Sequence, residues 1–165
     1  MSYPRAATDD LRRNDLHLGY AIVRVIFGLN IAMHGLSRFG DLAGFVDGVT
    51  KGFASTMLPE LLVRGFAWTI APLEALVGIA LMLGLATRTA LVVGAGLMAA
   101  LTFGVTLQQR WDVAGLQLTY VVVYGLLVAG LAYNRLSLDH GLSERLGDSR
   151  DNRRLSSHEA PATSP

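Results

Sequence analysis

Four long apolar stretches constrain the fold of this chain more than any other feature of its sequence. They cover residues 16–37, 65–87, 89–109 and 113–134, and the last two contain no Asp, Glu, Lys or Arg. A helix crosses a bilayer with about 20 mostly apolar residues, whereas each helix of a soluble bundle needs a polar face. Because hydrocarbon offers the backbone no hydrogen-bonding partner, we expect the stretches to be helical. The pattern predicts an all-α polytopic membrane protein with a four-helix transmembrane bundle.

The composition agrees with lipid as the surroundings of this chain. Only 16% of its residues are charged, while soluble domains carry about 25%. The net charge of +1 leaves no basic face for a nucleic-acid partner. The chain has no cysteine, which excludes a disulfide, a thiolate nucleophile and a cysteine-ligated metal. Any redox chemistry would therefore need a bound cofactor or a partner protein.

The first link between the stretches, residues 38–60, is long and has a helical pattern. Apolar side chains recur on one helical face, namely Phe39, Leu42, Val46, Val49 and Phe53. We expect an amphipathic interfacial helix in this first outer loop, although Gly44 and Gly48 leave an irregular loop as the alternative. The link at 84–88 is a tight turn, which predicts an antiparallel hairpin of the second and third spans. The link at 108–114 is also short.

The distribution of basic residues predicts the orientation in the membrane. Nine arginines fall on the side of the two tails and the second link, against three arginines and one lysine on the other side. Cytoplasmic loops carry the excess of Lys and Arg, so we expect both termini to be cytoplasmic. We divide the chain into an N-terminal tail (1–15), a membrane domain (16–139) and a C-terminal tail (140–165), and we expect the polar C-terminal tail to be disordered.

Arg24 and Glu74 are the full charges inside the spans. Such a charge near a helix centre costs about 2.5–3.5 kcal/mol on insertion scales. If Phe27 and Leu73 mark the middles of the first two spans, a rise of about 1.5 Å per residue places both charges at similar depths. We therefore expect an Arg24–Glu74 ion pair inside the bundle. Such a pair either lines a functional site or only fixes how two helices associate, and the sequence leaves both open.

Further candidate site residues are aromatic or imidazole side chains. His34 is either a donor or proton relay beside a ligand head group or a helix-end histidine bonded to a carbonyl or water. Tyr120 and Tyr124, one turn apart, are weaker candidates for binding a cofactor, because such tyrosines also serve simply in packing. We take Glu74, Arg24 and His34 as candidate catalytic residues. No spacing typical of a metal site occurs, so we expect no metal.

Small residues recur at helical spacing within the spans. Gly28 and Gly35 share a face of the first span, Gly78 follows Glu74 by one turn, and Gly96 begins a stripe on the third span. Such stripes let helices approach closely. We expect them to be packing positions, within the chain or between chains.

Several short motifs occur in a recognisable order. They are VRVIFG (23–28), MHGL (33–36), PLE (72–74), GLATR (84–88) and LSLD (136–139). In order and spacing they resemble the DoxX family of small four-helix membrane proteins, over residues 16–139. The matching positions are Arg24, Gly28, His34, Gly35, Glu74, Gly78, Gly84 and Arg88.

The resemblance implies a multi-pass protein of the bacterial cytoplasmic (inner) membrane. It further implies a quinone-linked or redox-accessory subunit of a membrane complex, with quinone as the candidate cofactor, with membrane or peripheral protein partners besides the lipid bilayer, and with homo-oligomers possible. Whether the chain takes part in an oxidoreductase reaction stays open. The alternative is a non-enzymatic membrane scaffold or assembly factor. A small-molecule transporter is less supported, because we detect neither an inverted repeat nor a pair of discontinuous helices.

Overall fold

The computed structural model describes residues 5–143 and 145, and this part of the chain contains helices, turns and bends but no strand. The elements follow the order α1 (Arg5–Arg38), η1 (Phe39–Asp41), α2 (Leu42–Gly52), α3 (Glu60–Leu83), α4 (Thr87–Leu107), α5 (Trp111–Ala129) and η2 (Leu131–Tyr133). The expected all-α class is confirmed.

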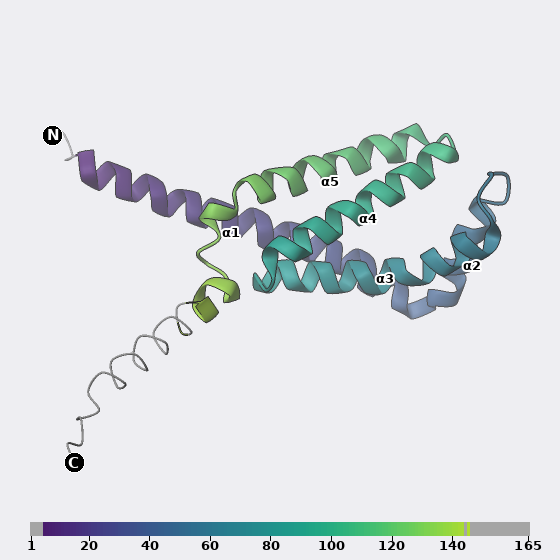
Figure 1. Ribbon diagram of the computed structural model, residues 1–165, viewed down its shortest axis with the longest axis horizontal. Coiled ribbons are helices and arrows are strands. Elements are labelled where there is room, and N and C mark those ends of the chain that lie inside the picture. The colour runs from purple at the N-terminus through teal and green to yellow at the C-terminus, as the bar shows by residue number, and fades with distance from the viewer. Residues whose placement is uncertain (1–4, 144, 146–165) are drawn as a thin grey trace, which may run out of the picture.

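The four long helices form a bundle with two different ends (Figure 1). Contacts join α1 to α3, α3 to α4 and α4 to α5, and successive long helices run in opposite directions. The short helix α2 packs on α3 at one end, here called the α2 end. The start of α1 and the segment after α5 lie at the opposite end, where α1 extends beyond the other helices. Four helical segments of the described residues are long and apolar enough to cross a membrane, as expected.

The outer surface of the bundle is apolar along its length. Ile26 on α1, Leu76 on α3, Val92 on α4, and Val122 and Leu126 on α5 are all more than half exposed. Patches of this extent are rare on soluble monomers. They fit lipid hydrocarbon, in which each helix satisfies its own backbone. The chain is therefore a membrane protein.

The helix boundaries differ from the expected spans at both ends of the chain. α1 begins at Arg5, before the apolar stretch, because no Pro or Gly between residues 5 and 15 interrupts the helix. α5 ends at Ala129, and the chain continues as the short η2. The turn between α3 and α4 and the helix α2 occur where we expected them. Residues 140–143 and 145 of the C-terminal tail are helical, contrary to the predicted disorder, and the rest of the tail lies outside the described residues.

α1 and α3 approach each other most closely at glycines. A Cβ atom on Gly28 would lie 2.8 Å from the Gly78 carbonyl oxygen, and one on Gly78 would collide with the Ala32 backbone. A Cβ on Gly35 would collide with the backbone of Ala71 and Ala75. The prediction that Gly28, Gly35 and Gly78 are packing positions is confirmed, whereas a Cβ on Gly96 would meet nothing within 4 Å, so Gly96 makes no such close contact in the described chain. The contacts at Gly28, Gly35 and Gly78 fix the register of the two helices.

Substituting Gly78 tests this close approach. Gly78→Ala should lower the free energy of unfolding by about 1–3 kcal/mol, because the backbones must move apart. Gly96 is the matched control, since a Cβ there would meet nothing within 4 Å. Gly96→Ala should leave stability unchanged or raise it by up to about 1 kcal/mol. Denaturation in detergent measures both, and equal effects would contradict the assigned contact.

Candidate functional site

The expected ion pair between Arg24 and Glu74 does not form. Glu74 pairs instead with Arg38, at the end of α1. Arg24 lies toward the opposite end, where its guanidinium donates to the carbonyl oxygens of Leu81 at 2.8 Å and Leu136 at 2.7 Å. The two charges therefore belong to separate networks.

The prediction was wrong because it assumed the register of the two helices. It placed Phe27 level with Leu73. The glycine contacts instead bring Gly28 beside Gly78 and Gly35 beside Ala75. The residue of α1 level with Glu74 therefore lies near the end of α1, within reach of the long Arg38 side chain.

The network around Arg24 stabilises the opposite end of the bundle. Arg24 is only 2% exposed and joins α1 to the last turn of α3 and to the chain after α5. Next to it, the Asp139 carboxylate accepts from the N–H groups of Ala86 at 2.7 Å and Thr87 at 2.8 Å, at the start of α4, as a helix cap does. Burial raises the pKa of Asp139, but hydrogen bonds from Thr87 and Ala86, with the charge of Arg24, together hold it below its usual value.

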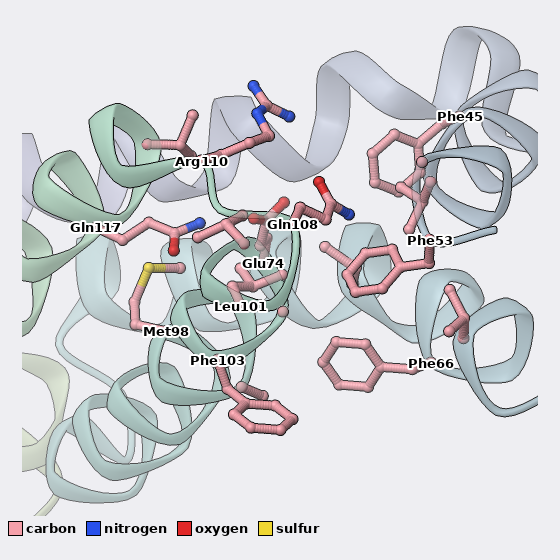
Figure 2. A pocket seen from close by; sticks show the side chains of 18 of the residues that line it. Phe45, Phe53, Phe66, Glu74, Met98, Leu101, Phe103, Gln108, Arg110 and Gln117 are labelled. Atoms are coloured by element: carbon pink, nitrogen blue, oxygen red, sulfur yellow. The ribbon is translucent and has the colours of Figure 1, made fainter. Parts of the chain in front are cut away.

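A cavity of about 630 Å³ lies at the α2 end of the bundle. All five α-helices contribute to its walls, and Figure 2 shows labelled side chains that line it. Its volume falls in the range of about 300–1,000 Å³ that is common for ligand pockets. Most of the lining is apolar, and Glu74, Arg38, His34 and Tyr120 are among its polar residues.

The Arg38–Glu74 pair joins three helices beside the cavity. The Glu74 side chain on α3 is 4% exposed and that of Arg38 on α1 is 25% exposed. The guanidinium of Arg38 also lies over the ring of Phe45 on α2, 4.7 Å from its centroid, a distance typical of cation–π contacts. Both residues of the pair line the cavity. The Glu74 carboxylate is nearly buried, and the Arg38 side chain that neutralises it is still partly accessible.

The structure brings together three of the five predicted site residues. Glu74, His34 and Tyr120 line the same cavity. The rings of His34 and Tyr120 pack edge to face, with their centroids 6.5 Å apart. Arg24 is absent from its lining. Tyr124 is 1% exposed and its hydroxyl packs against Gly94, so it belongs to the core. Whether the three residues act on a ligand stays a prediction.

Four polar lining residues were missed as site residues by the sequence analysis: Arg38, Gln108, Arg110 and Gln117. In Figure 2, Gln108 and Gln117 lie near Glu74, whereas the guanidinium of Arg110 points away from it. Gln117 precedes Tyr120 by three positions on α5, and this helical spacing could have revealed it. Gln108 and Arg110 lie in the α4–α5 turn, where no helical period applies. The polar groups gathered beside apolar walls suit a ligand that is itself amphiphilic.

The assigned ion pair can be tested by double-mutant cycles. Glu74→Gln should destabilise the protein by less than the about 3–5 kcal/mol typical of a fully buried pair, because Arg38 remains partly accessible. Combined with Arg38→Gln, it should cost less than the sum of the single changes. As a control, the destabilisation caused by Glu74→Gln and that caused by Arg24→Gln should add in the double variant. Unfolding titrations in detergent measure all variants, and a coupling of Glu74 to Arg24 alone would contradict the assignment.

One comparison with known proteins found a match. The family model described as "Methylamine utilisation protein MauE" matches residues 16–115. No match was found among curated proteins or among solved structures. The match to MauE overturns the resemblance to the DoxX family. Glycines at helix contacts and charges beside them, such as Gly28, Gly78 and Glu74, meet general needs of helical membrane bundles, so their order does not identify one family.

Proposed function

Since the chain belongs to the family of the methylamine utilisation protein MauE, we propose that it is an accessory membrane protein of a methylamine utilisation system. In this proposal it binds a small amphiphile in the cavity at the α2 end. The observation that carries the proposal is the Arg38–Glu74 pair, which faces a largely apolar cavity of ligand size. Membrane sites with buried ionisable groups are commonly functional.

The separation of polar from apolar side chains around the cavity supports an amphiphilic ligand. Figure 2 shows Gln108, Gln117 and Glu74 on one side, and Phe45 and Phe53 on the other. A molecule with a polar head and an apolar body would satisfy both groups.

A quinone is one candidate for this amphiphile and would make the protein a redox-accessory subunit. Its ring oxygens could accept hydrogen bonds from Arg38 or His34, both in the lining. Electrons would then pass between the quinone and a partner protein, since the chain has no cysteine to exchange them.

A scaffold or assembly factor is the second candidate function. It is favoured by the contacts that Arg24 and Arg38 make within the chain. Arg24 binds the carbonyl groups of Leu81 and Leu136, and Arg38 binds Glu74. Polar groups that satisfy one another can serve only to fix helix pairing.

Solvent extraction of the purified protein distinguishes the two functions. Mass spectrometry of the extract should find an amphiphile retained by the wild type and lost from Glu74→Ala. Glu60→Ala is the matched control, because Glu60 lies on the same helix with its side chain 73% exposed and should keep the ligand. No specific molecule in any extract would sink the binding proposal and support the scaffold.

We also propose that residues 16–139 form the membrane domain in a bacterial inner membrane, with both tails in the cytoplasm and the α2 end outside. The excess of arginines on the side of the tails supports this orientation. Lipid is then the main surrounding of the bundle.

The orientation can be measured with single cysteines, since the chain has none. Ser55 in the α2–α3 loop and Ser143 beyond α5 are both exposed. In intact cells whose outer membrane has been made permeable, an impermeant thiol reagent should label Ser55→Cys and leave Ser143→Cys unlabelled until the inner membrane is opened. The reverse pattern would invert the proposed topology.

A further inference from the structure

We propose that the ligand of the cavity is an acidic amphiphile and that Arg110 binds its anionic head group. This inference rests on the proposed function, in which the cavity holds an amphiphile, and it names the chemical class. Its starting point is charge. The cavity lining contains two arginines, Arg38 and Arg110, but one carboxylate, Glu74.

Arg110 lacks an acidic partner among the described residues. Arg38 is paired with Glu74, and Arg64 with Asp47 at 2.8 Å. No ion pair or side-chain hydrogen bond involves Arg110 in that part of the chain. Arg110 is an exposed residue of the cavity lining. Its guanidinium is therefore free to bind an incoming carboxylate or phosphate through two parallel hydrogen bonds.

The backbone of the α4–α5 turn holds this arginine at the cavity. Gln109 has a left-handed φ of 57°. Its N–H donates to the Thr106 carbonyl at 3.0 Å, and that of Arg110 donates to the Val105 carbonyl at 3.0 Å, the pattern of a Schellman cap. Glycine usually fills this position, because a Cβ atom disfavours the left-handed conformation. The cap fixes Gln108 and Arg110 on either side of Gln109, and both line the cavity.

Two amide side chains, those of Gln108 and Gln117, add further polar groups to the cavity lining. Gln108 and Gln117 line the same cavity as Arg110, and in Figure 2 both are seen in the part of the cavity where Glu74 lies. The Gln117 Oε1 atom is buried and has no hydrogen-bond partner in the described chain. Each amide can donate through its nitrogen to an anionic oxygen, whereas the Gln117 Oε1 atom can accept only from a group that carries a proton.

The remaining walls fit an apolar chain. Phe45, Phe53 and Phe66 gather on the other side of the cavity in Figure 2, and Phe53 also packs against Gly104 on α4, where a Cβ would come within 2.9 Å of its ring. Aromatic walls of this kind bury hydrocarbon without offering it polar groups. Head and chain therefore have separate places in one cavity.

Fluorescence of Trp111, which adjoins Arg110 in sequence, can report binding at this turn. The chain has two tryptophans, so Trp68→Phe leaves Trp111 as the single reporter. In this background, the full chain is placed in vesicles of phosphatidylcholine, which add no net charge and no tryptophan. The probes are a bromine-labelled fatty acid and a neutral short-chain quinone, both of which quench tryptophan. Arg110→Gln is the test variant, and Lys51→Gln is the control, because Lys51 is exposed and lies outside the lining.

The expected result is saturable quenching by the fatty acid, weakened about tenfold or more by Arg110→Gln, since losing a hydrogen bond to a charged group costs about 1.5–3 kcal/mol. Lys51→Gln should bind as the parent does, and Arg110→Lys should bind better than Arg110→Gln. Fatty-acid binding that is equally strong in Arg110→Gln, or saturable binding of the quinone alone, would overturn this inference and leave the proposed function standing. No saturable binding of either probe would overturn both.

Discussion

The close contact of α1 with α3 at Gly28, Gly35 and Gly78 determines which polar side chains of these helices meet. Lipid provides no hydrophobic force between two apolar helices, so close packing and polar contacts must hold them together. The glycines let the backbones touch at defined positions. A slip by one helical turn would shift α3 by about 5.4 Å and would separate Glu74 from Arg38. The position of the candidate site thus depends on residues that do not line it.

The two ends of the bundle use their arginines differently. At the opposite end, Arg24 donates to backbone carbonyl groups, and Asp139 caps α4. These contacts bind one part of the chain to another and leave Arg24 outside the cavity lining. At the α2 end, Arg38 and Arg110 both line the cavity. A firmly connected end can hold the helices in place while the other end keeps space between them.

The sequence predicted the features that depend on local pattern. Hydropathy predicted the four spans, and helical spacing predicted α2. The relative depth of residues on two different helices could not be predicted in this way, because it depends on the register between the helices. The Arg24–Glu74 pair was therefore wrong, although each residue was correctly expected to lie inside the bundle. Tyr124 was placed with Tyr120 by spacing alone, yet only Tyr120 reaches the cavity. Arg110 escaped notice because a turn has no period from which its direction could be inferred.

The position of Arg38 affects how any change at Glu74 must be interpreted. The same guanidinium contacts Glu74 on α3 and the ring of Phe45 on α2. Removing the carboxylate therefore frees a cation that also holds α2 against the bundle, so a lost ligand could reflect a moved helix. Arg110 avoids this difficulty, because within the described chain it forms no ion pair whose loss would disturb another helix. A change in binding at Arg110 is consequently the more direct measure of what the cavity holds.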